Sequence, residues 1–234
     1  MSEPLVNVII PAYLPTENHL RLLQLAVSSL SEQTHTDFSV SLVLNGLYCG
    51  KQEVMDAVKD FRYPDRLIIY NMEAKTSGAK ARNYGIRRTN AKYIAQLDAD
   101  DAYMPEKLEK QVAYMEEHPK CDLLGTLMYY KKEDGSVTDG PFRVNEYKDH
   151  SEIANQIAYG NVLSHGTVML RNESYKSFNL QYDEVNVPGT SWPNYGKIMY
   201  EDWDLWQRSI AKGVKTHVLQ ERLYLYSLGT SVAR

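Results

Sequence analysis

The feature that most limits how this chain can fold is a regular alternation of short apolar runs with amphipathic stretches in its N-terminal half. Four runs have the length of β-strands and lie at 6–10, 40–44, 67–70 and 93–97. Between the first two runs, Leu20, Leu23 and Val27 fall on one face of a helix. Strands that alternate with helices at this spacing form a parallel sheet with helices on both faces. The sequence therefore predicts a doubly wound α/β fold.

Acidic residues are crowded at the end of the fourth run, where Asp98, Asp100 and Asp101 follow one another closely. Ligands of such sheets bind at the carboxyl ends of the strands. Crowded carboxylates need a cation, a hydrogen-bond network or water to balance their charge, and Mg²⁺ or Mn²⁺ suits them because both prefer oxygen ligands. A helix expected from Pro105 leaves a second interpretation open, in which the acids only cap that helix.

The composition is that of one soluble globular domain. At 234 residues and 43% hydrophobic, the chain can bury one core, and we expect a single domain over 1–234. The net charge of −4 gives no reason to expect a nucleic-acid partner. Two cysteines are too few for a disulfide scaffold and indicate a reducing compartment. No run approaches the roughly 20 apolar residues of a membrane span, and residues 1–4 do not resemble a signal peptide. We therefore expect a cytoplasmic protein.

The C-terminal half follows a less regular pattern. Helices are predicted at 105–117, 151–159 and from 201 to about 212, and strands at 122–130, 167–170, 214–218 and 223–226. Residues 183–199 contain prolines and glycines and have no clear period, which is typical of a functional or mobile segment.

Five motifs occur along the chain in a fixed order. They are VIIPAY at 8–13, GAKARNYGI at 78–86, LDADD at 97–101 followed by Pro105, YEDWDL at 200–205 and LYLY at 223–226. Together they resemble glycosyltransferase family 2, whose members have the GT-A fold and use nucleotide-diphosphate sugars. The resemblance implies a Rossmann-like, mostly parallel sheet flanked by helices, with a mixed C-terminal part. It also implies that 1–119 bind the nucleotide sugar and that 120–234 bind the acceptor.

The resemblance implies a role for residues at two strand ends. The base and ribose of the donor are expected to contact Pro11, Ala12, Tyr13 and Asn45. The family usually has two acids where this chain has Leu44 and Asn45, which puts the base preference in doubt. Asn45 can hydrogen-bond a pyrimidine, but it can equally serve only as a turn residue before glycine.

The same resemblance assigns the charged residues of the nucleotide-binding half. Arg82 is expected near the nucleotide, Asp98 at the ribose or as a water-mediated ligand, Asp100 as the direct metal ligand and Asp101 as a supporting acid near the donor sugar. Lys80 is either near the nucleotide or a solvated helix residue. The metal is Mn²⁺ or Mg²⁺, and the sequence does not choose between them.

The catalytic base implied by the resemblance is Asp202. Its place at a helix N-terminus favours the ionised form that a base needs. A simpler interpretation remains, in which Glu201, Asp202 and Asp204 only complement the helix dipole. One base opposite the leaving group implies direct displacement with inversion at the anomeric carbon.

Other candidates near the acceptor are undecided from sequence. His165 either contacts a ligand or is structural, and Trp192, Tyr195 and Trp203 either form a stacking wall or pack in the core. The family often has arginine and histidine after the last tyrosine motif, whereas Ser227 follows it here, so we expect no metal or phosphate contact from the tail.

We therefore expect an inverting, metal-dependent glycosyltransferase that moves a sugar, with UDP as the expected carrier, to a hydroxyl of a glycan or related acceptor. Contact with a membrane would be peripheral and would depend on a lipid-linked acceptor. Two alternatives remain open: a non-catalytic carbohydrate-binding or scaffolding module, and a nucleotidyltransferase on a similar sheet. The latter typically has a glycine-rich, basic loop after the first strand, which 11–17 lack.

Overall fold

The computed structural model describes residues 3–47, 50–72, 75–139, 146–184 and 201–229. Its nine strands form one sheet and are β1 (Val6–Leu14), β2 (Phe38–Leu47), β3 (Leu67–Asn71), β4 (Tyr93–Gln96), β5 (Ala102–Tyr103), β6 (Leu123–Lys131), β7 (Val137–Thr138), β8 (Met169–Arg171) and β9 (Thr216–Ser227). The α-helices of the described residues are α1 (Glu17–Ser31), α2 (Lys51–Ala57), α3 (Gly78–Ile86), α4 (Lys107–Glu117), α5 (His150–Gln156), α6 (Asn172–Ser177) and α7 (Glu201–Ala211), and 3-10 turns occupy η1 (Pro64–Arg66) and η2 (His165–Thr167).

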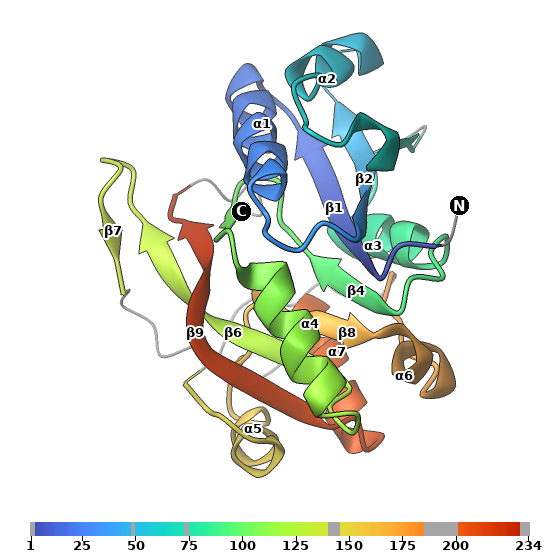
Figure 1. The fold of residues 1–234 in the computed structure, drawn as a ribbon, viewed down its shortest axis with the longest axis vertical. Helices are drawn as coiled ribbons and strands as arrows, with labels where there is room; N and C mark the ends of the chain where they lie inside the picture. The colour runs from blue at the N-terminus through green and yellow to red at the C-terminus, as the bar shows by residue number, and fades with distance from the viewer. Residues whose placement is uncertain (1–2, 48–49, 73–74, 140–145, 185–200, 230–234) are drawn as a thin grey trace.

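The N-terminal half is the predicted parallel sheet. Strands β3, β2, β1 and β4 are neighbours in that order, and all three pairings are parallel. Each of β1, β2 and β3 is followed by a helix or a 3-10 turn that leads back to the start of the next strand, as parallel pairing requires. The carboxyl ends of these strands therefore lie at the same edge of the sheet (Figure 1).

The first strand is longer than the sequence pattern predicts, because β1 continues through Pro11 to Leu14. Proline has no N–H for a sheet ladder. Leu97 N donates to Ile9 O, and this is where the ladder between β4 and β1 ends. The nitrogen of Pro11, two residues on, faces the same side of β1 beyond the end of β4, so its missing N–H costs no ladder bond.

The C-terminal half is mixed, as expected. The sheet continues from β4 through β8, β6 and β9 to β5, with antiparallel pairing everywhere except between β6 and β9. Two predictions are wrong here. The strands predicted separately at 214–218 and 223–226 are one continuous strand, β9. Its pairing with β6 is irregular near Leu127, where β9 forms a bulge. The strand predicted at 167–170 begins at Met169, because Thr167 belongs to the turn η2.

Both faces of the sheet are covered, and alternating side chains of the strands reach the two layers. Val8 and Ile10 of β1 join a core with α1 and α4, whereas Ile9 joins a second core with α3 and α7. Figure 1 shows α1 and α4 in front of the sheet and α3 and α7 behind it. The second core lies beneath the site described below. Among the described residues, no helix has the length and apolarity needed to cross a membrane.

Candidate active site

The acidic residues predicted to form the site lie in a tight turn after β4. The turn is closed by a hydrogen bond of 3.1 Å from Asp101 N to Asp98 O, and β5 begins at the next residue. The side chains of Asp98 and Asp100 are partly exposed, whereas Asp101 is only 3% exposed. The three carboxylates therefore divide into two at the surface and one inside.

Asp101 is held by β9. Tyr224 Oη donates to Asp101 Oδ2 over 2.7 Å, and Ser227 N donates to Asp101 Oδ1 over 2.7 Å. Burial and the charges of Asp100 and Asp98 raise the pKa of Asp101 well above its usual range, while these two hydrogen bonds oppose the rise. The buried carboxylate thus fastens the acidic turn to the last strand.

This arrangement depends on the absence of a side chain at Gly166. A Cβ there would lie 1.8 Å from Tyr224 Oη, and Tyr224 is fully buried. We expect Gly166→Ala to displace Tyr224 from Asp101 and to lower the free energy of unfolding by about 2–4 kcal/mol. The measurement is urea denaturation. The matched control is Gly160→Ala, because a Cβ at Gly160 has nothing within 4 Å, and equal losses in the two variants would contradict this account.

Arg82 of α3 joins the acidic turn to α7. Its Nη2 lies 2.5 Å from Asp98 Oδ1, and its Nη1 forms an ion pair with Glu201. The arginine and both partners are largely shielded, with side-chain exposures of 8% for Arg82, 26% for Asp98 and 15% for Glu201. A Cβ at Gly78 would lie 2.7 Å from Arg82 Nη1, so glycine at this position leaves room for the ion pairs. The guanidinium predicted near the nucleotide thus also connects two halves of the site.

Removing this arginine is expected to be costly to stability. Arg82→Met leaves Asp98 and Glu201 without their common cation, and breaking a buried ion pair costs about 3–5 kcal/mol. The control is Arg87→Met at the C-cap of the same helix. The ion pair of Arg87 with Glu184 involves a side chain that is 56% exposed and is worth about 1 kcal/mol or less. Urea denaturation at neutral pH measures both. A loss for Arg82→Met no larger than that of the control would refute the bridging role.

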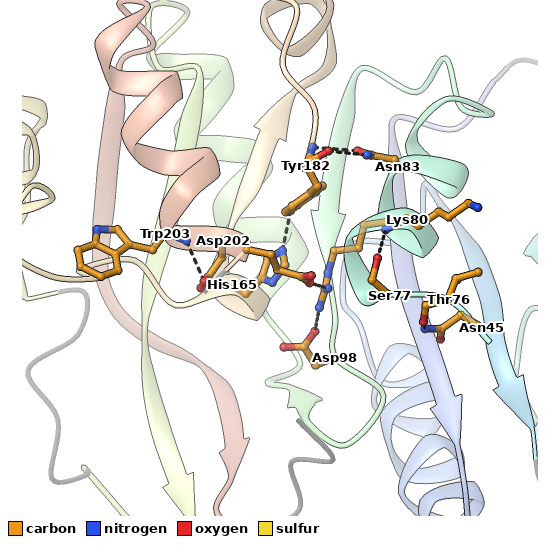
Figure 2. Close-up of polar contacts among 12 residues, drawn as sticks. Asn45, Thr76, Ser77, Lys80, Asn83, Asp98, His165, Tyr182, Asp202 and Trp203 are labelled. Carbon is orange, nitrogen blue, oxygen red and sulfur yellow. Dashed lines mark hydrogen bonds and ion pairs between the residues drawn. The ribbon is translucent and has the colours of Figure 1, made fainter. Parts of the chain in front are cut away.

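The predicted base, Asp202, lies next to this ion-pair network at the start of α7. Trp203 N donates to its Oδ1 and Asn161 Nδ2 donates to its Oδ2, each over 2.8 Å. Burial raises the pKa of the carboxyl group to about 6, although both hydrogen bonds lower it. The charges of Glu201 and Arg82 act on this carboxyl group as well, and Figure 2 shows Asp202 and Asp98 in the same part of the molecule. The carboxylate is therefore ionised at neutral pH and only weakly solvated, which suits a base.

The ends of β1 and β2, which were predicted to hold the nucleotide, are paired with each other, and a bulge interrupts their register. Ala12 pairs with Leu44 and Tyr13 pairs with Gly46, so Asn45 is the extra residue of β2. Asn45 is therefore not a residue of a simple turn. Its Nδ2 donates to Thr76 O over 2.9 Å, and its buried Oδ1 has no hydrogen-bond partner within the described part of the chain.

The other predicted nucleotide-binding residues lie along the end of β1. Pro11 and Ala12 are buried and contribute backbone to this edge, whereas Tyr13 is partly exposed. Lys75, which the sequence analysis did not select, donates from Nζ to Tyr13 Oη over 2.9 Å. No sequence pattern indicates this contact, because a single lysine in a polar loop has many possible surroundings.

Lys80 does not face the acidic turn. Its backbone N–H donates to Ser77 Oγ over 3.2 Å, which caps α3. The side chain is exposed, and Figure 2 shows it directed away from Asp98 and Asp202. Of the two interpretations of Lys80, the solvated helix residue agrees with this arrangement.

His165 is a buried member of an aromatic cluster. Its Nε2 makes a hydrogen bond of 2.6 Å with Tyr182 Oη, and its ring packs against Trp206 with centroids 5.9 Å apart. Burial and the charge of Arg82 lower the pKa of His165 well below its usual range, so the ring is neutral. Asn83 fixes the backbone of Tyr182 from the other side through bonds of 2.8 and 3.0 Å. The structural interpretation of His165 therefore fits its surroundings.

Of the three aromatic residues considered for a stacking wall, the structure describes one, Trp203. Trp203 is partly buried, and its Nε1 donates to Ile157 O over 2.6 Å. Trp192 and Tyr195 lie outside the described residues. Trp203 thus acts as a tether for the segment after α5.

The acidic turn fits a divalent cation that is shared with a ligand. Among the residues that the structure describes, no three histidine, cysteine or acidic side chains gather into a complete metal cage. Mg²⁺ and Mn²⁺ are commonly held by one or two carboxylates, with phosphate oxygens and water completing the shell. The partly exposed carboxylates of Asp100 and Asp98 match that smaller donor set.

Known proteins resemble this chain over most of its length. It is 31% identical over 229 residues to MJ1057, an uncharacterized glycosyltransferase of Methanocaldococcus jannaschii. This match covers 97% of this chain and 72% of the relative. It is 27% identical over 225 residues to EpsE, a putative glycosyltransferase of Bacillus subtilis. This match covers 95% of this chain and 73% of that relative.

Solved structures share the fold. TarS 1-349 of S. aureus in complex with UDP-GlcNAc matches 97% of this chain with a TM-score of 0.72 at 18% identity. The mannosyltransferase PcManGT from Pyrobaculum calidifontis, in complex with GDP-Man and Mn²⁺, matches 100% of this chain with a TM-score of 0.67 at 14% identity. The chain spans 60% and 59% of these two structures.

The sequence model of glycosyl transferase family 2 matches residues 7–178, which is more than half of the chain. This match includes the first three of the five motifs, and the described residues of the other two lie in α7 and β9. The prediction made from those motifs is thereby confirmed: the chain belongs to glycosyl transferase family 2, and it is a glycosyltransferase of the GT-A fold.

Proposed function

We propose that the protein transfers a sugar from a nucleotide diphosphate to a hydroxyl group of a glycan or related acceptor, with inversion and with a divalent cation. One observation carries this proposal. Arg82 pairs with Asp98 of the acidic turn and with Glu201, the neighbour of Asp202, although Glu201 is 119 positions away in the sequence. The guanidinium of Arg82 thus brings two groups of carboxylates together. Those of the acidic turn suit the cation of a donor diphosphate, and that of Asp202 suits a catalytic base.

The donor is proposed to bind along the ends of β1 and β2, and UDP is the proposed carrier. Asn45 Oδ1 supports this choice, because it has no partner among the described residues and an amide oxygen can accept the N3–H of uracil. TarS binds a uridine nucleotide and PcManGT a guanosine nucleotide, so the family likeness is compatible with more than one base. Pro11, Ala12 and Tyr13 border the same edge of the sheet.

Asp100, with Asp98, is proposed to hold the cation. When bound, Mn²⁺ or Mg²⁺ would neutralise the negative charge that develops on the leaving diphosphate. Asp98 also keeps Arg82 at the turn, and Asp101 keeps the turn attached to β9. With the cation bound, these residues would present a preorganised polar surface at the place where negative charge develops on the diphosphate.

Asp202 is proposed to remove the proton from the attacking acceptor hydroxyl. Trp203 N and Asn161 Nδ2 each donate to one oxygen of the carboxylate and hold its orientation. Because one base acts on the side opposite the leaving diphosphate, the oxygen of the acceptor displaces it directly. The proposed stereochemical outcome is inversion at the anomeric carbon.

The test is a donor and acceptor screen. UDP-, GDP- and dTDP-sugars are incubated with the protein and Mn²⁺ or Mg²⁺, and the released nucleotide and the anomeric configuration of the product are measured. The proposal predicts release of a nucleoside diphosphate that an acceptor accelerates, with an inverted product. Release of a sugar 1-phosphate in place of a nucleoside diphosphate would indicate nucleotidyl transfer, and sugar binding without turnover across the panel would indicate a binding module. Either result would reject the proposal.

A further inference from the structure

The carboxylate of Asp202 has a partner outside its own helix. Asn161 lies in the segment between α5 and η2, and its Nδ2 donates to Asp202 Oδ2 over 2.8 Å. The backbone N–H of Trp203 donates to Asp202 Oδ1 over 2.8 Å. Two donors from different parts of the chain therefore define the plane of the carboxylate.

The orientation of the Asn161 amide follows from a second hydrogen bond. Leu163 N lies 3.2 Å from Asn161 Oδ1. A backbone N–H can only donate, so the atom facing Leu163 is the amide oxygen, and the amide NH₂ is the group that faces Asp202. Asn161 is thus set as a donor to the carboxylate by its own local turn.

The segment that carries Asn161 is tethered to α7 on both sides. Trp203 Nε1 and Gln207 Nε2 donate to Ile157 O over 2.6 and 3.1 Å, and Trp206 Nε1 donates to Leu163 O over 3.1 Å. These bonds hold the carbonyls before and after Asn161 to the helix that carries Asp202. The contact between the two side chains is therefore organised in the absence of substrate.

Several charged or titratable groups face Asp202. Glu201 precedes it on α7, Arg82 approaches from α3 and the hydroxyl of Tyr182 lies in the same buried region. Burial has the largest effect on the pKa of Asp202 and raises it, and the hydrogen bond from Asn161 is the largest effect that lowers it. Arg82 also lowers this pKa, whereas Glu201 raises it.

We propose that Asn161 is a positioning residue for the base, whose amide both orients the Asp202 carboxylate and favours its ionised form. The inference rests on the proposed function, in which Asp202 accepts the proton of the acceptor. A purely structural role for Asn161 would consist of the turn with Leu163 alone. The two roles separate experimentally, because they use opposite ends of the amide.

The variant that separates them is Asn161→Asp. A carboxylate can still accept the hydrogen bond from Leu163 N, but it cannot donate to Asp202 and it adds a like charge beside it. We expect the acidic limb of the kcat/KM profile to move upward by about one to two pH units from about 6, with a loss of about 2- to 10-fold at pH 7 that grows to about 10- to 100-fold near pH 5 and that alkaline pH restores. Asn155→Asp is the matched control, because Asn155 is exposed on α5 and gains the same charge.

The second measurement does not depend on catalysis. A ¹³C NMR titration follows the carboxyl group of Asp202, identified by its loss in Asp202→Asn, and its pKa should rise in Asn161→Asp and stay unchanged in Asn155→Asp. An unchanged pKa, or a kcat/KM profile that is lowered equally at every pH, would overturn the inference. A raised pKa in a protein that transfers no sugar would count against the proposed function and not against the link between Asn161 and Asp202.

Discussion

Replacing Asp202 by asparagine is expected to lower kcat by about 10²–10⁴-fold, the usual contribution of a positioned acid or base. Asparagine cannot accept the proton of the acceptor hydroxyl. The proposed donor site lies on other elements, so the Kd for UDP is expected to remain unchanged. The measurements are steady-state transfer and calorimetric titration of UDP.

The pH dependence of the wild-type rate is a second, independent test of the role of Asp202. The base works only when ionised, and burial raises the pKa of Asp202 to about 6. The rate should therefore fall as the pH drops through about 6 and level off above it. Asp204→Asn is the matched control on the same helix, because Asp204 pairs with Arg208 at 2.6 Å. Comparable losses in the two variants would argue that the acids only complement the helix dipole.

Replacing Asp100 by alanine is expected to weaken strongly the cation-dependent binding of the nucleotide. Asp100 is a partly exposed carboxylate in a turn whose third acid, Asp101, is committed to β9. Loss of a metal ligand removes several kcal/mol of charge stabilisation, so we expect kcat/KM to fall by about 10²–10⁴-fold. The measurement is transfer at increasing Mn²⁺ concentration, which should restore activity only in part.

The control for this variant is Asp134→Ala, which removes the same charge from an exposed turn between β6 and β7. It should leave the cation dependence as in the wild type. If Asp100→Ala retains full activity, or if a chelator has no effect on the wild-type protein, the assignment of the cation to the acidic turn is wrong.

The parallel half of the fold was predictable because its signals are local. The length of each apolar run and the helical spacing of Leu20, Leu23 and Val27 specify strand and helix without reference to distant residues. The extension of β1 beyond Pro11 was missed, because it depends on where β4 ends. The joining of 214–218 and 223–226 into β9 was missed for a similar reason, since the bulge forms against β6.

The site shows the same division between local and distant signals. Motifs identified Arg82, Asp98, Asp100 and Asp202 as candidates, but they did not indicate that Arg82 pairs with both the acidic turn and α7. That connection requires α3 and α7 to pack on the same face of the sheet, which only the fold reveals. Asn161 belongs to no motif, and its contact exists because tryptophans of α7 hold the neighbouring backbone.

The most direct test of the central claim is calorimetric titration of the wild-type protein, Asp100→Ala and Asp202→Asn with UDP, each in the presence of Mn²⁺ and of a chelator. The account predicts cation-dependent binding to the wild type and to Asp202→Asn, and loss of that binding in Asp100→Ala. GDP and dTDP serve as further ligands if UDP fails, because thymine N3–H and guanine N1–H can also donate to the amide oxygen of Asn45. Failure of all three nucleotides, or equal binding to all three proteins with and without the chelator, would contradict it.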